Sequence, residues 1–227
     1  MSISVLINAI YFKGYWLNKF PKRHTYDSEF TSYSGEKTMK TFMSEYGFCG
    51  DSSSDDIFHV IHLNYVDERF ELSIFLPKER NTLKEALNKL DSLRFMNLMQ
   101  KRTVKMLHVS LLLKPSLILS FQISVPKFRI DTSVDPLKSN LQNLEITEIF
   151  SESADLSGIT NNLWVSDGVH KAMIETDEDG TVAAAVTLEY FNEMDGEVDP
   201  TYFTADHPFL FALTFENHPL FLGVLNQ

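Results

Sequence analysis

The order of strand-like and helix-like segments is the feature that most constrains how this chain can fold. Alternating or continuously apolar runs predict strands at residues 4–12, 58–65, 70–76, 123–130, 163–176, 209–213 and 221–225. Leucines at helical spacing predict helices only at about 82–100 and 136–144. Because strands follow one another without a helix after each, the pattern indicates an α+β fold with antiparallel or mixed sheets. A length of 227 residues, 44% of them hydrophobic, is enough for one domain with a substantial core.

Several segments carry more detailed expectations. Residues 4–12 are apolar around a single amide, Asn8, as in a central strand covered on both faces. Thr82 and Glu85 form a capping box that would open the first helix. The buried face of that helix would carry Leu83, Leu87, Leu90 and Leu93. The polar run at 51–56 is expected to be a loop between strands.

Composition and motifs argue against several classes of function. With a net charge of −11, the chain lacks the clustered basic residues that nucleic acids or acidic membrane surfaces require. Its nine glycines form no phosphate-binding loop, and no G-x-S-x-G motif occurs. His59 and His62 would lie on opposite faces of a strand, and adjacent residues such as Asp206 and His207 rarely form a working catalytic pair. We therefore expect no enzyme activity, no metal, no cofactor, and neither a nucleic acid nor a membrane as partner.

Residues 109–122, VSLLLKPSLILSFQ, disagree with their surroundings. The segment is apolar, but it is too short and too interrupted by Lys114 and Pro115 to span a membrane. One interpretation is a long hairpin or core strand. The other is a translated intron, because Val-Ser and Phe-Gln can be encoded by codons that resemble splice sites. Sequencing the transcript distinguishes these two hypotheses.

Residues 177–190, DEDGTVAAAVTLEY, join an acidic turn to a run of small side chains. Alanine favours helices, but this run has no polar helical face. With a period of two, one face carries only small side chains, from Thr181, Ala183, Ala185 and Thr187. The pattern predicts a strand that can enter a tightly packed place from a flexible turn at Gly180.

Blocks along nearly the whole chain resemble the serpin family of protease inhibitors. The upstream blocks are LINAIYFKGYW, LSIFLPKE and SVPKFRIDTSVDPLKSNLQNLEITEIFSESADLSGI. The carboxyl-terminal blocks are VSDGVHKAMIETDEDGTVAAAVTLEY and FTADHPFLFALTFENHPLFLGVLNQ. They follow serpin order, and only 109–122 lies outside the resemblance. The resemblance implies a serpin domain over 1–227, truncated at the amino end, without the family's amino-terminal helices and the first two strands of its large sheet.

The resemblance also implies a mechanism. In the family, a protease cleaves an exposed reactive loop, here within 177–202, and the hinge half of the loop inserts as a strand into the large sheet and traps the acylated protease. The implied hinge residues are Glu178, Gly180, Thr181, Ala183, Ala184 and Ala185. The family often has glutamate at the position of Val182, which lies on the opposite face and should leave insertion possible.

Family spacing leaves two positions open for the scissile bond. Counting from Glu178 gives Met194–Asp195, and counting back from Phe209 gives a bond near Glu197. Met194 suits a chymotrypsin- or elastase-like serine protease, whereas Glu197 suits an acid-preferring one.

Two other sets of residues match family positions. Asn8 and His170 correspond to a polar cluster that controls strand separation in the large sheet, and a buried amide and imidazole would need mutual or backbone hydrogen bonds. The carboxyl-terminal signature consists of Phe203, Asp206, His207, Pro208 and Phe209.

The implied function is inhibition of a serine protease, and two alternatives stay open: a non-inhibitory, serpin-like binding protein, and an inactive truncated product. Without the missing strands, residues 4–12 would have one unpaired edge and exposed apolar faces. The family default for location is the extracellular space. The chain as given lacks a signal peptide and an Asn-x-Ser/Thr acceptor, which leaves the cytoplasm open.

Overall fold

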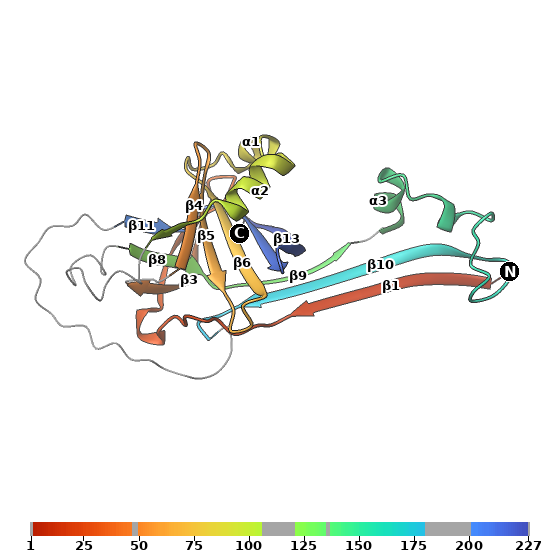
Figure 1. Ribbon diagram of the computed structural model, residues 1–227, viewed down its shortest axis with the longest axis horizontal. Helices are drawn as coiled ribbons and strands as arrows, with labels where there is room; N and C mark the ends of the chain where they lie inside the picture. The colour runs from red at the N-terminus through yellow and green to blue at the C-terminus, as the bar shows by residue number, and fades with distance from the viewer. Residues whose placement is uncertain (1, 47–49, 106–120, 135–136, 180–200, 227) are drawn as a thin grey trace, which may run out of the picture. The chain divides into compact units, whose positions relative to one another are not determined.

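The computed structural model describes residues 2–46, 50–105, 121–134, 137–179 and 201–226, which form two compact units (Figure 1). The first, which we call the long-sheet unit, contains the described residues of 1–13 and 128–176. The second, the core unit, contains those of 14–127 and 177–227.

Three long strands build the long-sheet unit. β1 (Ser2–Phe12) pairs in parallel with β10 (Leu163–Thr176), and β10 pairs antiparallel with β9 (Phe128–Val134). Helix α3 (Leu137–Asn143) packs on β10 at Gly168, where a Cβ atom would come within 3.1 Å of the Leu137 side chain. A short 3-10 helix, η3 (Glu148–Phe150), precedes β10.

Strand β1 exposes large apolar side chains. Val5 is 52% exposed, Ile7 75% and Tyr11 54%. Within the described residues, β1 pairs only with β10 and is the edge strand of its sheet. The exposed apolar faces expected for residues 4–12 without the family's missing strands are therefore present, and the expectation of a strand covered on both faces is wrong within the described residues.

A six-stranded sheet forms the centre of the core unit. Its strand order is β13-β12-β6-β5-β4-β7. The strands are β4 (Gly50–Ser54), β5 (Phe58–Asn64), β6 (Phe70–Pro77), β7 (Thr103–Lys105), β12 (Phe209–Phe215) and β13 (His218–Leu225). The strands predicted at 58–65 and 70–76 form the antiparallel pair β5–β6, and those predicted at 209–213 and 221–225 form the antiparallel pair β12–β13.

The core unit also contains a four-stranded sheet of order β11-β8-β3-β2. Its strands are β2 (Tyr26–Thr31), β3 (Lys37–Tyr46), β8 (Phe121–Pro126) and β11 (Thr201–Thr204). A 3-10 helix, η1 (Lys22–His24), leads into β2.

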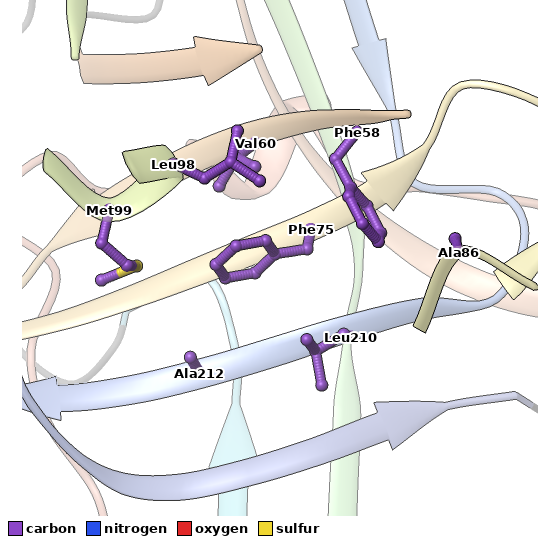
Figure 2. Close-up of a cluster of buried hydrophobic side chains, with 8 residues drawn as sticks. All are labelled: Phe58, Val60, Phe75, Ala86, Leu98, Met99, Leu210 and Ala212. Carbon is purple, nitrogen blue, oxygen red and sulfur yellow. The ribbon is translucent and has the colours of Figure 1, made fainter. Parts of the chain in front are cut away.

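Two helices, α1 (Leu83–Asn88) and α2 (Ser92–Gln100), help to close a buried apolar cluster. Figure 2 shows its members: Phe58, Val60, Phe75, Leu210 and Ala212 from the sheet, with Ala86, Leu98 and Met99 from the helices. Among the described residues, no helix is long and apolar enough to cross a bilayer.

The single helix predicted at 82–100 is wrong. Asp91 accepts a hydrogen bond from the Arg94 amide at 2.7 Å, as an N-cap does, and so starts a second helix. The predicted capping box is also absent, since the Thr82 hydroxyl donates to the Glu79 carbonyl and makes no cap bond. Leu93 is 72% exposed rather than buried.

Two further predictions need correction. The polar run at 51–56 lies largely in β4 rather than in a loop. Its serines can be buried because their hydroxyls form hydrogen bonds, and Ser53, for example, donates to the Leu98 carbonyl at 2.6 Å. The strand predicted at 123–130 is two strands, β8 and β9, in different sheets. The division falls after Pro126, where the missing amide proton cannot continue a ladder.

Candidate functional site: the root of the implied hinge

Residues Asp177–Asp179, which we call the hinge root, directly follow β10 and precede Gly180. Their backbone is held by neighbours in the core unit. The Trp16 indole N–H donates to the Asp177 carbonyl at 2.8 Å, and the Phe20 amide donates to the Glu178 carbonyl at 3.1 Å. Trp16 is only 2% exposed and stacks on Tyr65 at 4.4 Å, so the donor is fixed by packing.

The Glu178 carboxylate is the buried charge of the hinge root. It is 6% exposed, accepts a hydrogen bond from the Thr25 hydroxyl at 2.7 Å, and forms an ion pair with Lys127 at 2.5 Å. Burial raises the pKa of Glu178, but the hydrogen bonds from Lys127 and Thr25 outweigh burial and leave that pKa below the usual glutamate value. Glu178 is therefore an ionised, fully engaged anchor.

Asp179 is held at the surface by two lysines. Its carboxylate lies 2.9 Å from Lys22 Nζ and 3.8 Å from Lys19 Nζ. The hydrogen bond and charge of Asp179 raise the pKa of Lys22. The backbone amide of Asp179 also donates to the Asp177 carboxylate at 3.1 Å, which forms a local turn.

Most of the predicted loop residues lie outside the described part of the chain. These are Gly180, Thr181, Val182, Ala183, Ala184, Ala185, Met194, Asp195 and Glu197. Residues 109–120 of the apolar segment are outside it as well, while Phe121 and Gln122 lie in β8.

Asn8 and His170 meet as predicted, but not in a buried place. They face each other in the β1–β10 register, and the Asn8 amide nitrogen lies 3.1 Å from His170 Nδ1. Asn8 is exposed and His170 half-buried. A role of this pair in strand separation stays a prediction.

The predicted signature residues form a compact corner of the core unit. Phe203, His207, Pro208 and Phe209 are buried. His207 Nδ1 lies 2.9 Å from the Asp206 carboxylate, so the two side chains are in contact, and the expectation that they form no working catalytic pair stays a prediction. His207 Nε2 lies 2.9 Å from the Pro77 carbonyl, and Asp206 also forms an ion pair with Arg80.

His59 and His62 do not share a site. The His59 ring lies edge-on to Phe203 at 5.1 Å, whereas His62 is fully buried between serines. Within the described residues, no group of three or more histidine, cysteine or acidic side chains could hold a metal ion.

Sequence reasoning missed Trp16, Thr25 and Lys127 as partners of the hinge root. Trp16 and Lys127 lie inside two of the blocks that carry the resemblance, the end of LINAIYFKGYW and the start of SVPKF. Nothing in their spacing connects them to Glu178, because the contacts join segments more than fifty residues apart in the chain. Only the fold brings them together.

Comparison with known proteins supports one family. The family model described as Serpin (serine protease inhibitor) matches residues 1–227. Serpin I2 of Homo sapiens is 34% identical over 219 residues, which cover 92% of this chain and 49% of that protein. Iripin-2 of Ixodes ricinus is 34% identical over 236 residues, covering 100% and 54%. A leukocyte elastase inhibitor of Xenopus laevis is 34% identical over 213 residues, covering 92% and 53%. The chain thus spans about half the length of these relatives.

Solved structures agree with the fold. Serpin48 of the insect Tenebrio molitor superposes with a TM-score of 0.77 at 28% identity, over 98% of this chain and 56% of that one. Uncleaved ovalbumin gives a TM-score of 0.77 at 24% identity, over 98% and 54%, a likeness of fold alone. The predicted α+β serpin fold, represented by about half of its usual length, is confirmed.

Proposed function

The chain belongs to the serpin family, and from this premise we propose that it inhibits a serine protease by cleavage and insertion of the loop that follows the hinge root. The proposal depends on the contrast between the residues before Gly180 and the residues after it. Before it, Asp177–Asp179 are held by Trp16, Lys127 and Lys22. After it, the sequence presents the small-residue face of Thr181, Ala183 and Ala185.

The place of insertion would be the seam between β1 and β10. These strands pair directly over eleven residue pairs, from Ser2 with Leu163 to Phe12 with Ile174. A loop that folds back from the end of β10 runs antiparallel to β10, and it would also be antiparallel to β1. Insertion would replace one parallel ladder by two antiparallel ladders, which are slightly more stable per residue. That exchange supplies a driving force for trapping.

The proposed partner is a serine protease with an apolar specificity pocket. Two observations support it: Met194 occupies the position sixteen residues after Glu178, and relatives of this chain include leukocyte elastase inhibitors. A cut near Glu197 would instead indicate an acid-preferring protease.

The test is incubation of the purified chain with elastase, chymotrypsin and trypsin, followed by denaturing electrophoresis and mass spectrometry. We expect an SDS-stable covalent complex with elastase or chymotrypsin, with cleavage after Met194. Clean cleavage without a complex would indicate a non-inhibitory serpin, and absence of a folded product would indicate an inactive truncated chain. Either result contradicts the proposal.

A matched pair of variants separates insertion from cleavage. Thr181→Arg places a charge on the face that must be buried, at a cost on the order of 1–5 kcal/mol, so the protease should deacylate first and leave only cleaved protein. Val182→Glu changes the opposite face and should leave complex formation intact. If both variants form the covalent complex, or if neither does, the proposal that insertion buries the Thr181 face and not the Val182 face is contradicted.

A further inference from the structure

The parallel ladder between β1 and β10 contains a bulge. Its register shifts between Ser4, which pairs with Val165, and Val5, which pairs with Asp167. Ser166 of β10 is therefore an extra residue with no partner position on β1. Such bulges are rare in parallel pairs, and they interrupt the regular ladder of hydrogen bonds. Polar backbone groups at the bulge need other partners.

Two serine hydroxyls join the strands at this bulge, one in each direction. Ser166 Oγ donates to the Ser4 carbonyl oxygen at 2.7 Å, and Ser4 Oγ donates to the Trp164 carbonyl oxygen at 2.8 Å. Each bond runs from a side chain of one strand to the backbone of the other, so both must break when the strands separate. Both serines are half-buried, which strengthens these bonds relative to fully exposed ones. We call this pair of bonds the serine latch.

Helix α3 supports the same bulge. Lys138 Nζ donates to the Ser166 carbonyl oxygen at 3.3 Å and lies 5.6 Å from the centre of the Phe150 ring. Further along β10, the Gly168 amide donates to the Asp167 carboxylate at 2.7 Å. The hydroxyl and the carbonyl of Ser166 are thus both bound by specific partners. The bulge is therefore a defined part of the fold and not a frayed end.

The serine latch divides the seam between β1 and β10, which run side by side (Figure 1), into two sections. The eight-pair section joins 5–12 to 167–174, and the three-pair section joins 2–4 to 163–165. Strand β9 pairs with β10 only at 170–176, so among the described strands the three-pair section of β10 is held by β1 alone. The serine latch therefore reinforces the section that would otherwise separate most easily.

We propose that Ser4 and Ser166 keep the three-pair section closed while the eight-pair section separates, and so divide loop insertion into two stages. This inference rests on the proposed function, in which a loop inserts between β1 and β10 from the end near Thr176. The serines touch neither the protease nor the scissile bond. They are positioning residues that act through the width of the seam.

The sequence after Gly180 matches this division. The uncharged run 181–188 has eight residues, as many as the pairs of the eight-pair section, and Glu189 follows it. Insertion of this run needs only the eight-pair section. Insertion as far as Met194 has to break the serine latch as well. The second stage then competes with deacylation of the protease, so the serine latch sets how much of the chain ends as complex and how much as cleaved protein.

Hydrogen exchange of the uncleaved full chain, followed by mass spectrometry, tests the serine latch directly. In Ser4→Ala/Ser166→Ala, peptides covering 163–168 should exchange about tenfold faster than in the wild type, as expected for two lost hydrogen bonds of ordinary net strength. Ser4→Thr/Ser166→Thr keeps both hydroxyls and should retain most of the protection. The control Ser133→Ala, at an exposed position of β9, should exchange like the wild type.

Two results of this experiment would overturn the serine latch. One is unchanged exchange at 163–168 in the alanine variant. The other is a wild-type chain in which these amides already exchange as fast as those of an unfolded chain, a readout that needs no variant to fold.

Incubation with elastase or chymotrypsin tests the effect on insertion. The ratio of SDS-stable complex to cleaved chain should rise by up to about tenfold in Ser4→Ala/Ser166→Ala, because the second stage has two fewer bonds to break. The threonine variant and Ser133→Ala should keep the wild-type ratio. An unchanged or lower ratio in the alanine variant overturns the two stages. A wild-type chain that forms no complex contradicts the proposed function and with it the staged insertion, whereas the exchange experiment, which uses no protease, still decides whether the serine latch exists.

Discussion

Strand β12 of the core unit and strand β1 of the long-sheet unit have similar apolar sequences and opposite surroundings. In β12, every residue from Phe209 to Thr214 is buried. In β1, Val5, Leu6 and Ile7 are all exposed. Strand β12 pairs with β13 and β6 on its two edges, whereas β1 pairs with β10 alone among the described strands. An apolar strand sequence thus favours burial, but strands and helices from elsewhere in the chain determine whether the strand is buried.

The difference has an energetic consequence. Full burial of a large aliphatic or aromatic side chain stabilises a fold by about 1.5–3 kcal/mol. The core unit gains this at most positions of β5, β6 and β12, while Ile7 and Tyr11 of β1 gain little. Among the described strands, β1 is also an uncharged eleven-residue edge strand, and a sheet edge is where a further strand can pair. We therefore expect mutations to act very differently in the two units.

The largest contrast is expected for a matched pair of leucines. Leu72 of β6 is fully buried, and Leu6 of β1 is 41% exposed. Leu72→Ala should lower the free energy of unfolding of the core unit by about 2–5 kcal/mol, because it leaves a cavity. Leu6→Ala should change that of the long-sheet unit by less than about 0.5 kcal/mol.

The two tryptophans allow each unit to be followed separately in denaturant titrations. Trp16 lies in the core unit and Trp164 in the long-sheet unit, so Trp164→Phe and Trp16→Phe backgrounds each report on one unit. A cost for Leu6→Ala as large as that for Leu72→Ala would mean that β1 is covered in solution, and the comparison would fail.

A matched pair of glycines should give a smaller contrast. A Cβ atom on Gly223 of β13 would overlap the buried Phe211 ring, whereas one on Gly168 of β10 would meet the end of the Leu137 side chain at 3.1 Å. Gly223→Ala should cost about 1–3 kcal/mol through overpacking. Gly168→Ala should cost less, because Leu137 is only half-buried and can move. The same denaturant titrations measure both changes, and a larger cost at Gly168 would reverse the interpretation.

Local sequence patterns predicted many of the strands, missed β2, β4, β7 and β11, and described the surroundings of the strands poorly. The strand at 163–176 and the two hairpins of the core unit follow directly from alternation and turn residues. The division of 82–100 into two helices was missed. Leucines continue at helical spacing across Asp91, but Asp91 is an N-cap with extended backbone angles, so the helix is interrupted there. Strand β4 was missed because its serines become strand residues only when Leu98 and His62 supply hydrogen-bond partners.

The candidate site could be predicted only in part, for a related reason. The hinge residues and Glu178 follow from a contiguous motif that a reader of the sequence can compare with a family. The partners of Glu178, Thr25 and Lys127, come from distant segments whose spacing carries no signal. The pairing of Asn8 with His170 was predictable from family positions, but its exposure depends on layers that no local pattern describes.

The two units should also differ in how much acid lowers their free energy of unfolding, and this difference should be smallest between pH 7 and 5. In the core unit, the pKa values of Glu71, Glu178 and Asp206 are all lowered: burial acts to raise each one, but hydrogen bonds and charges from cationic neighbours outweigh it. In the described part of the long-sheet unit, only Asp155, which is exposed and bound by Ser157, has a lowered pKa.

A carboxylate with a lowered folded pKa contributes stability that is complete above its unfolded value, about 4.5 for glutamate and 3.8 for aspartate, and is lost as the pH falls through the folded pKa. The free energy of unfolding followed by Trp16 should therefore change little down to pH 5 and fall steeply below about 4, more than that followed by Trp164. The substitution Glu71→Gln should flatten the Trp16 curve, because an amide at this position has no charge to lose. Equal acid dependence at the two tryptophans would show that these buried carboxylates do not distinguish the units, and would leave packing alone as the basis of their difference.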